Sequence, residues 1–171
     1  MQIILHFCKI KIENLALINK DKHLALVQQI EHLIGNEKNI IANLANISAH
    51  LKMELNLFWV GFYFVDKSNE KELVLGPFQG PIACARIPFG KGVCGTSWSE
   101  KKSILVSDVN QFEGHIACNA LSKSELVCPV IVDNKVVCIL DADSEKINGF
   151  CEKDLLMFES ICSKISSFFA S

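Results

Sequence analysis

The chain has 171 residues and a formal net charge of -2; half of its residues are hydrophobic and 21% are charged. This length is typical of one domain with a sizeable core, and the charge balance offers no basic surface for a nucleic acid. We therefore expect a single globular domain with no nucleic-acid partner.

The first 20 residues follow no clear pattern, and we assign them to an N-terminal extension of unknown role, with the domain over residues 21–171. The apolar start "MQIILHF" lacks a positively charged n-region, and no run of 18 apolar residues occurs. We therefore expect neither a signal peptide nor a membrane partner. Eight cysteines without an export signal indicate a reducing compartment, by default the cytoplasm, in which cysteines serve as thiols, ligands or catalysts.

Helices are predicted at both ends of the domain and strands between them. Apolar residues at helical spacing predict helices over residues 22–35 and 38–55, with Gly35 and Asn36 as the stop between them. Runs of β-branched and aromatic residues predict five strands, over residues 57–65, 72–78, 103–109, 126–132 and 135–143. A tight hairpin turn is expected at Asp133 and Asn134, and helical spacing returns over residues 152–169. The predicted fold class is α/β, in the α+β sense: a central antiparallel sheet with N-terminal and C-terminal helices packed on it.

Three of the eight cysteines differ from the rest in their surroundings. Cys84, Cys94 and Cys118 occur in segments rich in turn-forming or polar residues. Cys138 lies in an apolar strand and Cys162 on an apolar helix stripe, where a thiol packs as a small hydrophobic group. Because loops carry chemistry more often than strands do, the first three are candidates for catalysis, with exposed cysteines of no consequence as the alternative.

Neither a structural zinc site nor a dinucleotide-binding site is expected. Cys84, Cys94, His115 and Cys118 could supply a Cys₃His zinc set, but the chain contains no C-x-x-C pair and the spacing is not that of a structural zinc site. The string "GKGVCG" over residues 90–95 formally matches the dinucleotide-binding pattern G-x-G-x-x-G. Because Pro88 interrupts the approach and the next predicted strand follows too soon for a long helix, we interpret the match as accidental.

Three acidic residues form a second candidate group. Glu125 follows the segment of Cys118, and Asp141 and Asp143 end an apolar strand. Alternation along a strand points residues 141 and 143 to the same face, so their carboxylates should lie side by side. Close carboxylates raise each other's pKa, which can leave one protonated at neutral pH. A strand end exposed to water is the alternative.

Five strings of the sequence are more specific than these patterns. They are "WVGFY" (59–63), "LGPFQGPIACARIPFGKGVCGTS" (75–97), "DVNQFEGHIAC" (108–118), "SELVCPV" (124–130) and "LDADS" (140–144). In these strings the sequence resembles the free methionine-(R)-sulfoxide reductases, single-domain enzymes with the GAF fold. The resemblance extends over roughly residues 43–165.

The resemblance implies a thiol-dependent reduction of free L-methionine-(R)-sulfoxide to L-methionine. It implies that Cys118 is the nucleophile and forms a sulfenic acid, that Cys84 resolves it as an intramolecular disulfide, and that Cys94 is an auxiliary thiol able to pair with Cys118. Thioredoxin is the expected reductant and no cofactor or metal is needed. A homodimer is a candidate oligomeric state.

The resemblance also implies roles for residues around the substrate. Glu125, Asp141 and Asp143 are expected to line the sulfoxide pocket, and Trp59 and Tyr63 to enclose the methyl group of the substrate, with core packing as the alternative for this aromatic pair. Two further substrate-binding residues are expected, Ile116 and Ala117.

A function from another class remains as an alternative. GAF domains also serve as modules that sense a small molecule and catalyse nothing. Such modules usually lie beside an output domain, for which this chain has no room.

Overall fold

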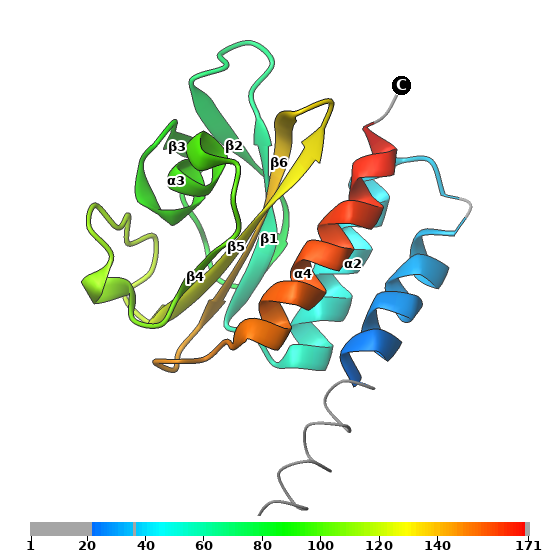
Figure 1. Cartoon of the computed structure of the whole chain (residues 1–171), viewed down its shortest axis with the longest axis horizontal. Coiled ribbons are helices and arrows are strands. Elements are labelled where there is room, and N and C mark those ends of the chain that lie inside the picture. The colour runs from blue at the N-terminus through cyan, green and yellow to red at the C-terminus, as the bar shows by residue number, and fades with distance from the viewer. Residues whose placement is uncertain (1–21, 36, 170–171) are drawn as a thin grey trace, which may run out of the picture.

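The computed structural model describes residues 22–35 and 37–169, so the predicted N-terminal extension over residues 1–20 and the predicted stop at Asn36 lie outside the described residues. Two long helices cover one face of a sheet, a third packs on their outer side, and a shorter helix with its flanking loops covers the other face of the sheet (Figure 1). The helices are the one over residues 22–34, α2 (Ile40–Leu55), α3 (Gly92–Glu100) and α4 (Glu152–Ile165), with 3₁₀ turns η1 (Val109–Gln111) and η2 (Ser166–Phe168). The strands are β1 (Trp59–Val65), β2 (Glu72–Gln79), β3 (Arg86–Pro88), β4 (Ile104–Val106), β5 (Ser124–Val132) and β6 (Lys135–Ser144).

The six strands form one antiparallel sheet in the order β3-β2-β1-β6-β5-β4. Alternating residues of β1 serve its two faces, as strand geometry requires. Val60 and Phe62 are buried against the three larger helices, and Trp59 and Tyr63 are buried in the layer that contains α3. The predicted α/β fold class with an antiparallel sheet is confirmed. None of the helices in the described part of the chain has both the length and the apolar run that crossing a membrane requires.

The β5–β6 hairpin contains both the predicted turn and an irregularity. Asp133 and Asn134 both adopt positive φ, 49° and 60°, as the predicted tight turn demands. The register then shifts by one residue, because Ile131 pairs with Val136 whereas Val130 pairs with Cys138. One extra residue of β6 is accommodated at this bulge.

The strand predicted over residues 103–109 is shorter than expected. Only Ile104–Val106 pairs with β5, and the chain then enters η1. The side chain of Asp108 accepts a hydrogen bond from the backbone N–H of Asn110. Such local bonding by Asp competes with a strand ladder and favours a turn, which ends the strand early.

Helix α3 was not predicted, and its presence corrects the assignment of Cys94 to a turn-rich segment. The string "GVCGTSWSE" contains two glycines and no apolar stripe at helical spacing, so local propensity argues against a helix. Packing overrides that propensity, because Val93, Cys94 and Trp98 are buried against the sheet. A Cβ at Gly95 would lie 2.4 Å from the carbonyl oxygen of Pro88, so glycine is required where α3 meets the preceding turn.

Candidate active site

Strand register gathers acidic and aromatic side chains on the α3 face of the sheet. Asp143 of β6 pairs with Trp59 of β1 on one side and with Glu125 of β5 on the other. Asp141 lies two residues earlier on β6 and points to the same face. The prediction that residues 141 and 143 share a face is confirmed, and the register adds a third carboxyl group directly opposite Asp143.

A pocket opens on this face and contains about 540 Å³ of empty space, part of which is open to solvent. Eight of the ten predicted site residues line it: Trp59, Tyr63, Cys94, Ile116, Cys118, Glu125, Asp141 and Asp143. Cys84 adjoins the pocket through a covalent bond to Cys118. Ala117 is exposed and is not among the lining residues, so its predicted contact with the substrate finds no support in this arrangement.

Three polar residues of the pocket were not predicted as site residues. Asn119 and Ser122 line it, and so does His115, which the sequence indicated as a polar loop residue rather than as part of the zinc set. No local pattern distinguishes Ser122 from Ser124 two positions later. These residues take part because the segment between η1 and β5 folds over the sheet, which the sequence does not reveal.

Cys84 and Cys118 form a disulfide, with their Cα atoms 5.5 Å apart and their positions 34 apart in sequence. Cys84 lies between β2 and β3, and Cys118 lies between η1 and β5. Cys118 is exposed and Cys84 is partly buried, so a reductant can reach the disulfide from the Cys118 side. The two loops thus meet at the pocket.

Trp59 and Tyr63 hold the segment that carries Cys84. The hydroxyl of Tyr63 donates to the backbone oxygen of Cys84 at 2.9 Å, and the indole N–H of Trp59 donates to that of Pro81 at 3.1 Å. Their rings stack with centroids 6.0 Å apart, above Gly61, where a Cβ would lie 2.7 Å from the Trp59 ring. Both residues are almost fully buried and both line the pocket, so core packing and a role in the site are compatible.

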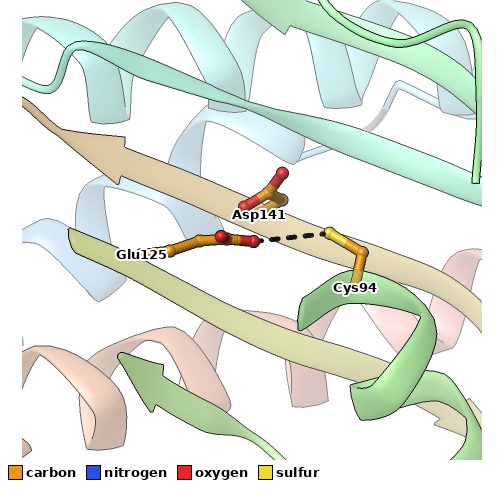
Figure 2. A group of neighbouring side chains, drawn as sticks. All are labelled: Cys94, Glu125 and Asp141. Carbon is orange, nitrogen blue, oxygen red and sulfur yellow. Dashed lines mark hydrogen bonds between the residues drawn. The ribbon is translucent and has the colours of Figure 1, made fainter. Parts of the chain in front are cut away.

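The acids are linked to one another and to neighbouring side chains. The Cys94 thiol donates to Oε1 of Glu125 at 3.9 Å (Figure 2). Nε2 of His115 lies 3.4 Å from Oε2 of the same carboxyl group. The hydroxyl of Ser122 donates to Oδ1 of Asp143. Oδ1 of Asp141 is buried and has no hydrogen-bond partner among residues 22–35 and 37–169.

Burial, more than any neighbour, sets the protonation of this group. Burial and then the charge of Asp143 hold the pKa values of Glu125 and Asp141 well above their ordinary range. Burial raises the pKa of Asp143 to about 6. The hydrogen bond from the Ser122 hydroxyl and the charge of His115 act in the opposite direction and limit this rise. Burial also lowers the pKa of His115, which disfavours its charged form beside Glu125.

Cys94 is a buried neutral thiol. Burial, followed by the charges of Asp141 and Glu125, raises its pKa well above the ordinary value. A thiol is unreactive in this form, because the thiolate is the nucleophile. The Cys₃His zinc set is also not assembled here, since Cys84 and Cys118 are bonded to each other while Cys94 faces the acids. Cys138 and Cys162 are buried in the opposite core layer, as predicted for packing residues.

Comparison with known proteins places this fold and site among named relatives. The GAF domain family matches residues 42–170. The chain is 57% identical over 129 residues to GAF domain-containing protein A of Dictyostelium discoideum, covering 75% of this chain and 80% of the relative. It is 40% identical over 156 residues to the free methionine-R-sulfoxide reductase of Saccharomyces cerevisiae, covering 87% of each. Among solved structures, the free methionine-R-sulfoxide reductase of Neisseria meningitidis in complex with its substrate matches with a TM-score of 0.84 and 45% identity, covering 86% of this chain and 87% of that one.

The Asp143→Asn substitution should remove part of the pH dependence of stability. Because the pKa of Asp143 is raised from 3.8 to about 6, its contribution to stability is complete below about pH 4 and is lost as the pH rises through about 6. Between about pH 4 and pH 7 the free energy of unfolding of the parent should fall by roughly 1–3 kcal/mol relative to that of the variant. Urea unfolding of the two oxidised proteins across this range measures the difference. Parallel curves would contradict the raised pKa.

Proposed function

The chain belongs to the GAF-domain family of free methionine-R-sulfoxide reductases, and from this premise we propose that it reduces free methionine-(R)-sulfoxide to methionine by thiol chemistry at Cys118. The observation that carries the proposal is the Cys84–Cys118 disulfide beside a pocket lined by buried carboxyl groups, whose burial raises the pKa values of Glu125 and Asp141. An oxidoreductase that uses two thiols leaves this bond as its oxidised product. Thioredoxin as the reductant and a homodimer as the oligomeric state stay predictions.

Activation of the sulfoxide is the first chemical requirement. The oxygen of a sulfoxide leaves poorly unless it is protonated or strongly hydrogen-bonded, because it otherwise departs with negative charge. Burial holds the pKa values of Glu125 and Asp141 well above their ordinary range, which favours the protonated forms that can donate to that oxygen. Asp141 has an unsatisfied buried oxygen, which a bound substrate could also approach.

Reduction then proceeds in three balanced steps. The Cys118 thiolate attacks the sulfur of the protonated sulfoxide, and the oxygen passes to the Cys118 sulfur as the S–O bond of the substrate breaks. Methionine leaves, and Cys118 becomes a sulfenic acid. The Cys84 thiol attacks that sulfenic acid, which forms the disulfide and releases water. A dithiol protein such as thioredoxin then reduces the disulfide by exchange and is itself oxidised.

Substrate orientation depends on the contrast between the two sides of the pocket. Trp59 and Tyr63 offer an apolar aromatic surface suited to the methyl group, and Ile116 adds to it from the loop. The carboxyl groups suit the sulfoxide oxygen. Fixing methyl group and oxygen on opposite sides leaves one epimer with its sulfur facing Cys118.

The alternative of a sensing module without catalysis is not favoured. A sensor needs a pocket but has no need of a disulfide joining two of its loops at the mouth of that pocket. The relatives named above that are matched over most of their length include reductases.

The substitution Cys118→Ser should abolish turnover while the protein stays folded, because a hydroxyl cannot reduce sulfur. Cys84→Ser should instead release about one equivalent of methionine per enzyme and then stall, since the sulfenic acid loses its partner. Quantifying methionine under single-turnover and multiple-turnover conditions separates the two. Near-parent turnover by Cys118→Ser would remove this residue from the role of nucleophile.

The substitution Glu125→Gln should lower kcat by about 10² or more, because an amide donates a hydrogen bond but no proton. Glu113→Gln is the matched control: the same change on an exposed residue of the neighbouring loop should leave the rate near that of the parent. The measurement is methionine formation at saturating substrate. A rate within about twofold of the parent for Glu125→Gln would show that it supplies no proton.

Substrate choice is expected to exclude peptides. The pocket lies under the segment over residues 112–123 and would enclose a whole amino acid, including its charged ends. A methionine sulfoxide within a peptide has lost both charges, and the peptide chain continues from it in two directions. The resulting clashes and unpaired polar groups can discriminate against the peptide by about 10⁴-fold or more. Free R and S epimers and the N-acetylated amide of the R epimer should be compared by methionine released. Comparable turnover of the blocked R substrate would contradict the enclosed pocket.

A further inference from the structure

Three side chains from three different elements converge on one point in Figure 2: Cys94 from α3, Glu125 from β5 and Asp141 from β6. The sulfur of Cys94 and one oxygen of each carboxyl group all lie within 4.8 Å of one another. The residues are 2%, 6% and 7% exposed, respectively. A thiol and two carboxyl groups are therefore enclosed together, away from bulk water.

Asp141 supplies a second and independent observation. Its Oδ1 is buried without a hydrogen-bond partner in the described part of the chain, whereas buried polar atoms of native proteins are nearly always paired. The carboxyl group belongs to the converging trio, so an external group could satisfy it there. A sulfoxide oxygen accepts hydrogen bonds, but a thiol with two carboxyl groups is also a complete set of anionic donors for a cation.

The donor types select the kind of cation. Thiolate ligands favour Zn²⁺ and similar thiophilic ions, while Mg²⁺ and Ca²⁺ prefer oxygen alone. Zinc bonds of about 2.3 Å to sulfur and about 2.0–2.2 Å to oxygen place tetrahedral ligand atoms roughly 3.5 Å apart. The Cys94 sulfur and Oε1 of Glu125 are 3.9 Å apart, so a small side-chain adjustment closes the site around an ion.

Glu125 is held in the orientation that such a site needs. Its Oε1 faces Cys94, while its Oε2 lies 3.4 Å from Nε2 of His115. Outer contacts of this kind orient the ligands of metal sites and strengthen binding. Three protein ligands would leave the fourth position of the ion open toward the pocket, as in zinc sites that keep one position for an exchangeable ligand.

We propose that Cys94, Glu125 and Asp141 bind one thiophilic divalent cation, for which Zn²⁺ is the best match, and that this cation competes with the sulfoxide substrate. On binding, the cation displaces the protons of the three groups to solvent, and its charge compensates theirs. The competition rests on the proposed function, because metal-bound Glu125 and Asp141 can no longer donate to the sulfoxide oxygen. The binding of the cation does not rest on the proposed function.

The binding test uses the full chain in its disulfide form, so that neither Cys84 nor Cys118 offers a thiolate. Cys8→Ser and Cys151→Ser form the background and remove two further thiols outside the trio. Co²⁺ serves as the probe, because a thiolate ligand gives a charge-transfer band in the near ultraviolet and tetrahedral geometry gives intense visible bands. We expect one equivalent of Co²⁺ to bind and Zn²⁺ to displace it.

Single substitutions in this background assign the ligands. Cys94→Ser should abolish the charge-transfer band, and Asp141→Asn should weaken Co²⁺ binding at least about tenfold, the lower end of what even an outer contact contributes. Cys162→Ala, a buried thiol in the opposite core layer, is the matched control and should keep the band. A band that survives Cys94→Ser, or no stoichiometric binding at micromolar Co²⁺, would overturn the site.

The competition is tested separately, in a protein that carries Cys84→Ser and Cys118→Ser in addition to Cys8→Ser and Cys151→Ser. This protein can neither form the disulfide nor turn over substrate. Free methionine-(R)-sulfoxide added to this Co²⁺-loaded protein should diminish the charge-transfer band. A band unchanged at saturating sulfoxide would overturn competition. An absence of reductase turnover by the reduced parent would instead count against the proposed function, while the cobalt titration of the oxidised protein would still decide the metal site.

Discussion

Mutual burial of three carboxyl groups is the constraint on which the rest of the site depends. Taking Glu125, Asp141 and Asp143 out of water next to one another is unfavourable for their charged forms, so the folded protein keeps protons there. A helix of poor intrinsic propensity, α3, helps to bury the group. Protons held there lie in the pocket that Cys118 also lines, which is where the proposed reaction would need them.

Trp59 and Tyr63 connect the carboxyl groups to the segment that carries Cys84. Trp59 and Tyr63 extend from the sheet beneath the pocket and hydrogen-bond the backbone of the segment that carries Cys84. The same two rings thus limit the pocket and fix one partner of the disulfide. Gly61 makes this possible, because any larger residue there would collide with the Trp59 ring and with Phe78.

Much of the fold could be predicted from the sequence, since amphipathic periodicity identified the helices at both ends of the domain and runs of β-branched and aromatic residues identified the long strands. The shared face of Asp141 and Asp143 followed from strand parity alone. Helix α3 could not be predicted, because its glycines serve close packing rather than local preference. The place of Cys94 among the acids and the contacts of His115 and Ser122 arise from segments distant in sequence. Family resemblance identified eight of the seventeen residues that line the pocket, but the raised pKa values of the acids follow mainly from burial, which only the structure reveals.

The bulge in the β5–β6 hairpin has a consequence for how this chain can vary. Near the turn Ile131 pairs with Val136, and continuing that register would set Glu125 opposite Ala142, whose side chain faces the large helices. The extra residue in β6 reverses the parity and sets Glu125 opposite Asp143 instead. The bulge therefore decides which face of the sheet the acids share. Pairing the same residues without the bulge would divide the carboxyl groups between opposite sides of the sheet, whereas removal of the bulged residue would leave Glu125 opposite the same aspartate in a regular ladder.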